Sequence, residues 1–439
     1  MSKPKCLISL FPQEFVHFLK DENISKFYFV YDSKNNVLKS SHAQLQTIAD
    51  FIQSDKRDFM RHEGMFFQIT RHYDTLQGVF VHRTNRGLGA GGLRYWDYNT
   101  IEDYLRDGLR LAVGMTRKNA LAGLWWGGGK GLMAHNPGVD KNDPVVRASL
   151  YQEFGELMTS LRGCYVSAED LGTSVNDMAN VFSKTRFTTC IPPAFGGSGN
   201  PSIATARGII CGMEAALEFI GDAGLHGKTV AVQGMGNVGG PLIRFLFDKK
   251  VKKVVACDIN PDIVQHLKGE LSDKDFEASV VSSGNNSIFQ SECDIFSPCA
   301  TGAILNPDTI PRLRARIVCG AANNQLEDSD RDSELLYDRG IIYVPDFLTN
   351  RMGIVNCANE QYGYVNNDPY IERHLTKDWE YSIHQITLKV LQESKATGEP
   401  PSGVAIRMAD NLSLESHPIF GHRGEQVIDS LVADRWHEK

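Results

Sequence analysis

A glycine-rich turn near the middle of the chain constrains its fold more than any other feature. It follows the apolar run 229–233 and precedes a helical pattern from Pro241 to Lys249, and Asp258 ends the next apolar run about 20 residues beyond it. This order of strand, turn, helix and acid is typical of a Rossmann dinucleotide-binding unit. The alternative is an ordinary glycine-rich turn in which Asp258 caps a helix in solvent. The turn has the form Gly-x-Gly-x-x-Gly and consists of Gly234, Met235, Gly236, Asn237, Val238 and Gly239.

These residues favour NAD over NADP as the bound cofactor. Glycines permit the tight turn, and the free N–H groups and dipole of the helix N-terminus attract a pyrophosphate. A carboxylate at Asp258 would bind a ribose hydroxyl and repel a 2′-phosphate. Neither Ile259 nor Asn260 supplies the basic side chain that a 2′-phosphate requires.

Two different strand patterns divide the chain. Short β-rich runs and polar turns fill residues 25–87 and predict an antiparallel or mixed sheet. Capping boxes, Asn99 with Glu102 and Ser174 with Asp177, mark the starts of two later helices. After residue 200, strand and helix signals alternate strictly, which predicts a parallel sheet of βαβ units. Its strands are expected at 229–232, 254–257, 295–296, 317–320 and 341–344.

We therefore predict an α/β fold with two lobes, an N-terminal α/β domain and a doubly wound Rossmann domain. Residues 196–201, Gly-Gly-Ser-Gly-Asn-Pro, are expected to form the hinge. In the last ~80 residues, one helical stripe that includes Trp379 and Ile383 should pack back on the first domain, so that the cleft lies between the lobes. The predicted divisions are 1–197, 198–360 and 361–439.

Length, charge and cysteine content exclude several other classes of protein. A chain of 439 residues is too long for one hydrophobic core. A net charge of −7 argues against nucleic acid or anionic membranes as partners, and no apolar run is long enough to span a bilayer. The first residues, Met1 to Cys6, do not have the pattern of a signal peptide. Nine cysteines without a CxxC pair or a zinc-like His spacing predict free thiols in a reducing cytoplasm and no bound metal.

Two lysines and an aspartate are the candidate catalytic residues. Lys118 follows Met115 by three residues, so both lie on one face of an apolar-striped helix, where a lysine is unusual unless it pairs with an anion. Lys130 follows three consecutive glycines, where the backbone can approach a ligand closely. Asp170 ends a short buried strand, the position at which open α/β sheets place their chemistry.

Together, these three side chains suit oxidation at an α-amino carbon. One ammonium group can pair with a substrate carboxylate, and a second lysine, its pKa lowered by burial and by its cationic neighbour, can act as a general base. The carboxylate can carry the proton to and from the amine. Taken singly, each residue is better explained as an ordinary exposed lysine or a capping aspartate, because both are common. Periodicity does not show that the three converge.

Several ordered motifs make the chain resemble a known family, the glutamate/leucine/phenylalanine/valine dehydrogenases. The resemblance runs from about residue 75 to 365 and weakens in the C-terminal helices. It is carried by residues 115–120, 123–124, 127–131, 166–173, 199–202 with Thr205, the turn at 234–239, 298–300, 322–325 and 345–347.

The resemblance implies two lobes that close on NAD and an amino acid substrate, in a homo-oligomer assembled through the first lobe. It implies that Lys118 holds the substrate carboxylate, that Lys130 is the general base on the attacking water, and that Asp170 handles the proton on the amine. The remaining implied contacts are Gly91, Gly92 and Met115 to the substrate, and Thr205, Cys299, Ala300 and Asn324 to the cofactor.

Position 90 indicates which side chain is accepted. In glutamate-specific members a lysine precedes the Gly-Gly-x-Arg turn and pairs with the side-chain carboxylate, whereas this chain has Ala90. A second carboxylate would be buried unpaired at a cost of several kcal/mol, so the resemblance implies reversible oxidative deamination of a branched-chain or aromatic amino acid to a 2-oxo acid and ammonia.

Two departures from the family pattern keep other functions open. Trp125-Trp126 replaces a small pair before the triple glycine, and Arg351-Met352 replaces Ala-Gly, where Met352 could narrow the pocket and Arg351 could add a charge near it. The tryptophans are expected to pack rather than to contact ligands. The alternatives are a catalytically silent NAD-binding sensor of the same fold and a glutamate-type enzyme that uses another cation.

Overall fold

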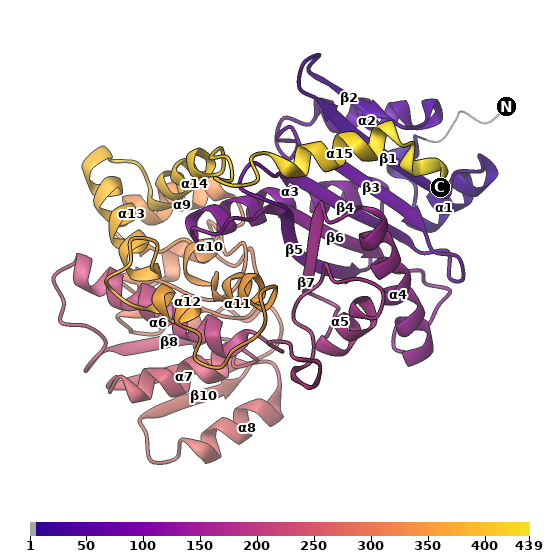
Figure 1. Cartoon of the computed structure of the whole chain (residues 1–439). Coiled ribbons are helices and arrows are strands. Elements are labelled where there is room, and N and C mark those ends of the chain that lie inside the picture. The colour runs from indigo at the N-terminus through magenta and orange to yellow at the C-terminus, as the bar shows by residue number, and fades with distance from the viewer. Residues whose placement is uncertain (1–5) are drawn as a thin grey trace.

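Two separate sheets organise the chain, and each forms the centre of one lobe (Figure 1). The computed structural model describes residues 6–439. The prediction that the first residues do not form a signal peptide concerns residues 1–5, which lie outside the described residues. The predicted two-domain α/β fold is confirmed. Within residues 6–439, no helix has the length and apolar character required to cross a membrane.

The first lobe contains a mixed seven-stranded sheet in the order β2-β1-β3-β4-β6-β5-β7, as the alternating runs predicted. Neighbouring strands are antiparallel from β2 to β6, and β5 lies parallel to both β6 and β7. Its strands are β1 Lys26–Asp32, β2 Val37–Ser40, β3 Gly64–Ile69, β4 Leu76–Arg83, β5 Gly89–Trp96, β6 Gly127–Ala134 and β7 Tyr165–Glu169.

Five helices accompany this sheet, and side-chain caps mark the starts of α3, α4 and α5. The long helix α3 begins after Thr100, whose side chain accepts from the Asp103 N–H, so the predicted cap at Asn99 was wrong by one residue. The box formed by Ser174 and Asp177 is confirmed at the start of α5. The helices are α1 Pro12–Asp21, α2 Gln46–Ser54, α3 Ile101–Leu121, α4 Pro144–Ser160 and α5 Val175–Phe182.

The second lobe contains an all-parallel six-stranded sheet in the order β10-β9-β8-β11-β12-β13. Five of its strands were predicted, and the sixth, β10, is a half-exposed edge strand whose mixed polarity hid it. The strands are β8 Thr229–Gln233, β9 Lys253–Asp258, β10 Phe276–Val280, β11 Ile295–Pro298, β12 Ile317–Val318 and β13 Ile342–Tyr343. The helices are α6 Ser202–Phe219, α7 Gly239–Asp248, α8 Pro261–Glu270 and α9 Ser329–Asp338.

The last helices contact both lobes. Helix α14 packs on α3, and α15 lies across the first lobe, where Ile428 and Leu431 join its buried core (Figure 1). Helix α13 packs instead on α6 of the second lobe. Trp379 lies outside this helix, contrary to the predicted stripe, because Ser382 caps it. These helices are α10 Asp346–Thr349, α11 Met352–Glu360, α12 Pro369–Glu372, α13 Ile383–Thr397, α14 Pro401–Leu412 and α15 Arg423–Ala433.

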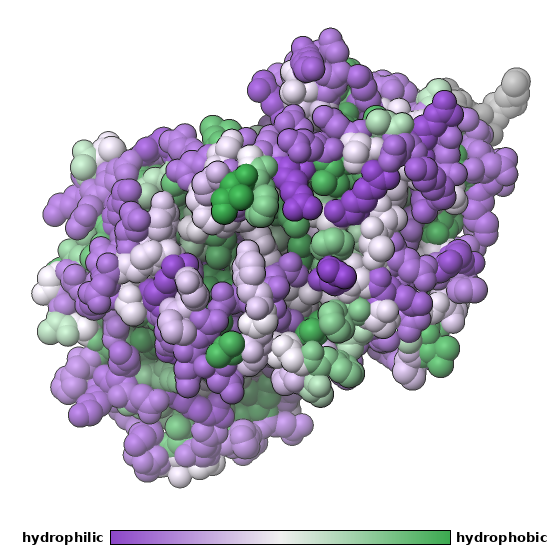
Figure 2. Space-filling view, viewed as in Figure 1, coloured by the Kyte–Doolittle hydropathy of each residue, from purple (hydrophilic) through white to green (hydrophobic). Residues whose placement is uncertain are grey.

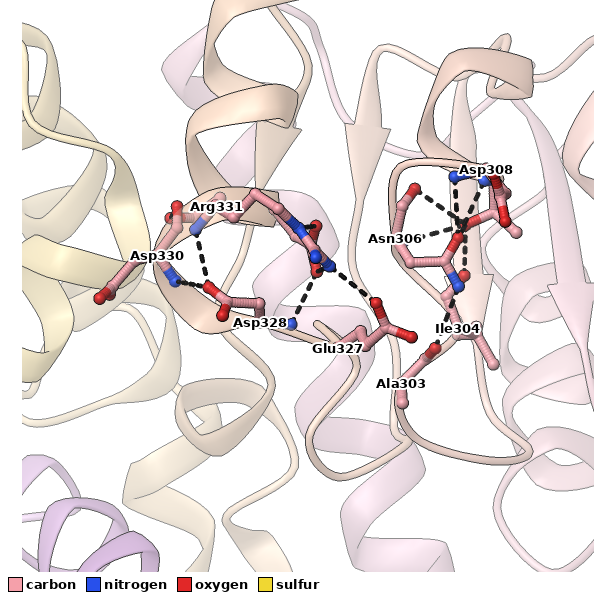
Figure 3. Close-up of polar contacts among 11 residues, drawn as sticks. Ala303, Ile304, Asn306, Asp308, Glu327, Asp328, Asp330 and Arg331 are labelled. Atoms are coloured by element: carbon pink, nitrogen blue, oxygen red, sulfur yellow. Dashed lines mark hydrogen bonds and ion pairs between the residues drawn. The ribbon is translucent and has the colours of Figure 1, made fainter. Parts of the chain in front are cut away.

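Side-chain hydrogen bonds order two loops beyond β11 and β12 in the second lobe. Asp328 caps α9 by accepting from the N–H groups of Asp330 and Arg331, and the Arg331 guanidinium pairs with Glu327 at 2.7 Å (Figure 3). The Ala303 N–H donates to the Asn324 carbonyl at 2.7 Å, which ties the two loops together. The face of the molecule in Figure 2 is mostly hydrophilic, with scattered apolar patches, because the apolar side chains fill the two cores.

Candidate active site

Lys130 and Asp170 form a close ion pair in the first lobe. Lys130 lies on β6, Asp170 directly follows β7, and the Lys130 Nζ to Asp170 Oδ2 distance is 2.8 Å. The lysine side chain is 5% exposed and the aspartate side chain 20% exposed, so the pair is shielded but reachable. Thr173 fixes the aspartate backbone, because its hydroxyl accepts from the Asp170 N–H and donates to the Asp170 carbonyl.

Two glycines of β5 make room for this pair. A Cβ atom at Gly92 would lie 2.6 Å from the Asp170 Cβ, and one at Gly91 would lie 2.0 Å from the Gly129 carbonyl oxygen. The Cβ at Gly91 would also lie 2.9 Å from the Met115 Cγ. Gly91, Gly92 and Met115, for which the family resemblance implies substrate contacts, therefore surround the same small region of the sheet.

Lys118 extends from α3 toward the second lobe. Its half-buried Nζ donates to the Asn323 Oδ1 at 3.2 Å, and the Asn350 amide donates to the same oxygen at 2.8 Å. Next to Asn323, the Asn324 N–H donates to Asp346 Oδ2 at 2.7 Å. Polar groups from both lobes thus meet around the Lys118 ammonium group.

Burial and neighbouring charges change the protonation of these groups. Burial lowers the pKa of Lys130, although Asp170 opposes the shift. Burial likewise lowers the pKa of Lys118, with Lys130 adding to the effect and Asp346 opposing it. Burial alone would raise the pKa of Asp170, but Lys130 and Arg94 together hold it well below its ordinary value. The site therefore combines a persistent carboxylate with lysines that lose their protons more readily than free lysines.

Arg94 and Asp107 also belong to this cluster, although the sequence analysis gave them no role. The Arg94 Nε donates to Asp170 Oδ2 at 3.1 Å, and its Nη1 donates to both oxygens of Asp107. One signal could have shown Asp107: it precedes Lys118 by eleven residues, three turns of α3, and so lies on the same face.

The predicted nucleotide turn has the geometry that a pyrophosphate requires. Gly234 has φ +91°, and a Cβ at Gly239 would lie 2.0 Å from the Gly234 carbonyl oxygen, so both positions need glycine. A Cβ at Gly236 would meet nothing within 4 Å, which leaves open space in front of the turn, and α7 begins at Gly239. These residues fit a dinucleotide.

Asp258 lies at the end of β9 beside this turn. Its carboxylate accepts from the Met235 N–H at 2.7 Å and from the Asn260 N–H at 2.8 Å, and it is half-buried. A carboxylate has about four lone-pair positions, so these two bonds leave acceptor capacity for a ribose hydroxyl.

Two of the other predicted cofactor contacts lie near the carboxyl end of β11, and a third lies on α6. The strand order reverses between β8 and β11, the switch point at which open α/β sheets bind ligands. Cys299 and Ala300 follow β11, and the Ala300 Cβ would lie 2.8 Å from a Cβ at Gly234. Thr205 is buried on α6, where its hydroxyl donates to the Pro201 carbonyl. Among residues 6–439, no group of three or more His, Cys, Asp or Glu side chains is placed to hold a metal ion.

Comparison with known proteins identifies the family of the chain. Residues 66–187 match the Glu/Leu/Phe/Val dehydrogenase dimerisation domain, and residues 196–414 match the glutamate/leucine/phenylalanine/valine dehydrogenase domain. A leucine dehydrogenase from Geobacillus stearothermophilus is 42% identical over 76% of this chain and 85% of its own length. The chain belongs to the glutamate/leucine/phenylalanine/valine dehydrogenase family.

Other amino acid dehydrogenases are similar to this chain over most of its length. A phenylalanine dehydrogenase from Lysinibacillus sphaericus is 34% identical over 78% of this chain and 88% of its own length. The crystal structure of L-tryptophan dehydrogenase from Nostoc punctiforme is similar with a TM-score of 0.65 and 31% identity, covering 80% of this chain and 96% of that one. The chain is therefore an amino acid dehydrogenase, an NAD(P)-dependent oxidoreductase acting on CH–NH2 donors, and the prediction of oxidative deamination is confirmed.

The two departures from the family pattern are packing features of this dehydrogenase. Trp126 is buried in the first core, and Trp125 stacks on the Arg86 guanidinium, whose carbon lies 4.2 Å from the ring centre. Arg351 is fully buried and donates to the carbonyl oxygens of Leu121 and Tyr381. Met352 packs against α6, where a Cβ at Gly208 would lie 2.8 Å from its Cγ. Arg351 therefore points its charge at main-chain carbonyls, and the expectation that these two residues line the pocket is not supported.

Proposed function

We propose that this dehydrogenase catalyses the reversible oxidative deamination of an apolar L-amino acid, branched-chain or aromatic, to a 2-oxo acid and ammonia, with NAD as cofactor. One observation carries the proposal: the buried Lys130–Asp170 pair in the first lobe lies with Lys118, which reaches polar groups of the nucleotide-binding lobe.

In the proposed reaction, each of the three side chains has one task. The Lys118 ammonium group pairs with the substrate carboxylate and so orients the α-carbon. Lys130, whose pKa is lowered, takes a proton from the water that attacks the iminium carbon. Asp170 moves the proton at the substrate nitrogen as the amine becomes ammonia. When bound, NAD supplies the hydride acceptor for the α-carbon.

The side chain at position 90 supports an apolar substrate. Ala90 is fully buried on β5 and belongs to the apolar cluster that contains Trp126 and Val166. A carboxylate at the end of the substrate would therefore find no cation at this position and would be costly to desolvate. The leucine and phenylalanine dehydrogenases that the chain resembles at 34–42% identity are consistent with this preference.

The nucleotide site supports NAD rather than NADP. The Asp258 carboxylate would repel a 2′-phosphate, and its neighbours Ile259 and Asn260 supply no positive charge. We assign the pyrophosphate to the turn at 234–239, the ribose to Asp258, and the nicotinamide side to Thr205, Cys299, Ala300 and Asn324.

We further propose the assembly and location of the enzyme. The match of residues 66–187 to a dimerisation domain supports a homo-oligomer. The nine free cysteines support a reducing, cytoplasmic environment. We divide the chain at 197 and 360, with the substrate in the first part and NAD in the second, and the C-terminal helices as a third part that contacts both.

A panel of amino acids tests the proposal directly. We expect the absorbance of the reduced nicotinamide to rise with leucine, valine or phenylalanine in the presence of NAD. It should rise far less when glutamate replaces these amino acids or when NADP replaces NAD. Turnover of glutamate above leucine would instead identify a glutamate-type enzyme with another cation in place of residue 90.

A variant of the proposed base separates an enzyme from a sensor. Lys130→Met keeps the volume of the side chain but removes the amine, so kcat should fall by about 10²–10⁴-fold while NAD still quenches protein fluorescence. Bound NAD without any NADH formation in the unchanged protein would favour the catalytically silent sensor.

A further inference from the structure

A chain of charged groups leads from Asp170 away from Lys130, and the proposed mechanism does not use it. Asp170 Oδ2 accepts from two cations at once, the Lys130 Nζ at 2.8 Å and the Arg94 Nε at 3.1 Å. On its other side, the Arg94 Nη1 donates to the Asp107 oxygens at 3.1 and 3.0 Å. The Tyr98 hydroxyl donates to Asp107 Oδ2 at 2.7 Å and completes the chain.

Arg94 connects two elements that both carry site residues. It lies on β5, two residues after Gly92, and it bonds to Asp107 on α3, the helix that carries Lys118. Its side chain is 19% exposed, so both of its carboxylate contacts are largely shielded from water. A rigid guanidinium group can bridge two carboxylates in fixed geometry, which a flexible lysine does less well.

We propose that Arg94 is a positioning residue for the deamination proposed above: it holds Asp170 Oδ2 at the point where it meets Lys130, and Asp107 and Tyr98 fix the guanidinium from behind. The inference rests on the proposed function of Lys130 and Asp170. Without Arg94, Asp170 keeps a single cation partner and can turn fully toward Lys130, which would hold the lysine in its charged form.

The charges around the pair determine the sign of the expected effect. Arg94 lowers the pKa of Lys130, whereas Asp170 and Asp107 raise it. Removing the guanidinium should therefore raise the pKa of Lys130. The charged or titratable groups that act directly on the pair are Arg94, Asp107, Lys118, Tyr165 and Glu169. Tyr98 and Asp346 lie one group further away, against Asp107 and Lys118 respectively.

The test combines a kinetic profile with a direct titration of the amine. Arg94→Gln is compared with Arg94→Lys, which keeps the charge, and with Arg110→Gln, which removes an exposed arginine of α3 that bonds to Asp58. NADH formation from leucine is followed against pH, and the protonation of Lys130 is measured by competitive acetylation and peptide mass spectrometry, which requires no turnover.

For Arg94→Gln we expect kcat to fall by about 10–100-fold and the acidic limb of its pH profile to move up by about one pH unit, with the same shift in the acetylation pKa of Lys130. Arg94→Lys should recover part of both, and Arg110→Gln should match the unchanged protein. If Arg94→Gln does not fold, Tyr98→Phe should shift both curves in the same direction by a smaller amount.

Two results would overturn the inference. One is a loss of kcat without movement of either pH curve, which a purely structural role would produce. The other is an unchanged acetylation pKa in a folded Arg94→Gln protein. If no amino acid yields NADH, the proposed function fails, and the acetylation shift still decides whether Arg94 controls Lys130.

Discussion

At position 92, the absence of a side chain lets the Asp170 carboxylate lie against strand β5. A Cβ there would come within 2.6 Å of the Asp170 Cβ and 2.9 Å of the Glu169 carbonyl oxygen. Real Cβ atoms do not approach so closely, so the chain after β7 would have to move. Two hydrogen bonds between the Thr173 hydroxyl and the Asp170 backbone hold this segment in place. A Cβ at position 92 would therefore displace the Asp170 side chain.

Gly92→Ala should therefore damage the site more than the fold. We expect kcat with leucine to fall by about 100-fold because Asp170 is displaced from Lys130, a loss within the range for a misplaced proton-transfer group. Gly114→Ala on α3 is the matched control, since a Cβ there meets nothing within 4 Å and alanine favours a helix by up to about 1 kcal/mol. Steady-state kinetics and thermal unfolding of both variants test this; equal activity in the two would contradict it.

At the scale of single residues, the candidate catalytic side chains could be predicted from the sequence, but their hydrogen-bond partners could not. Lys118, Lys130 and Asp170 followed from motif resemblance and from the glycines beside them. Arg94 appeared only as part of the Gly-Gly-x-Arg motif, which forms part of strand β5 rather than a turn, and Asp107 was not considered. Their bonds depend on how α3 crosses β5, and the spacing of residues within one element does not specify such a crossing.

At the scale of elements, a histidine joins helix α15 to the first lobe. The His422 Nε2 lies 3.1 Å from Glu63 Oε1, and its Nδ1 lies 3.0 Å from Glu425. The hydrogen bond to Glu63 raises the pKa of His422, although burial opposes the shift. When it is protonated, the ring joins the start of α15 to the segment before β3 through ion pairs with Glu63 and Glu425.

The contribution of His422 to stability should depend on pH. Because its pKa is raised in the folded state, the stabilisation is fully present below the ordinary value of 6.5 and is lost as pH rises through the folded pKa. His422→Gln should cost about 1 kcal/mol in unfolding free energy near pH 5.5 and less near pH 8.5. Urea unfolding at both pH values measures this, with the exposed His226→Gln as control. A cost that grows with pH would contradict the assignment.

Prediction of elements succeeded where the apolar pattern was strong. The five buried parallel strands were all found, because burial on both faces leaves continuous apolar runs. Strand β10 was missed because it lies at the edge of the sheet, where it pairs only with β9, and because most of its side chains are exposed or half-buried. Trp379 was assigned to a helix because its spacing fits, although its ring packs on His374 in the preceding segment.

At the scale of the whole molecule, Arg351 joins the lobes in a way that the family pattern did not suggest. It lies at the start of α11 and donates to the last carbonyl of α3 and to Tyr381 before α13. Burial lowers the pKa of Arg351 to about 9. The two carbonyl oxygens accept hydrogen bonds from the guanidinium but carry no negative charge that would raise its pKa again. Two-lobed topology was predictable from the change in strand pattern; this contact between lobes was not.

Arg351→Ala should destabilise the protein by about 2–5 kcal/mol, because it opens a cavity and leaves two carbonyls unpaired. Arg314→Ala is the control, since that side chain is 62% exposed and should contribute within about 0.5 kcal/mol. Urea unfolding measures both. A loss below about 1 kcal/mol would indicate that water replaces the guanidinium at the carbonyls.

Helix α3 therefore makes a contact with the second lobe near one end and a contact with the candidate active site toward the other. Arg351 donates a hydrogen bond to the Leu121 carbonyl at the end of the helix. Asp107 lies about 21 Å away along the helix axis and accepts from Arg94, which in turn donates to the Asp170 carboxylate. If the nucleotide-binding lobe moves relative to the first lobe, a tilt of α3 at Leu121 would displace Asp107 toward its other end. Motion between the lobes and the position of the Asp170 carboxylate would then be coupled through α3. Substitutions near Leu121 would change kcat without contacting a reacting atom.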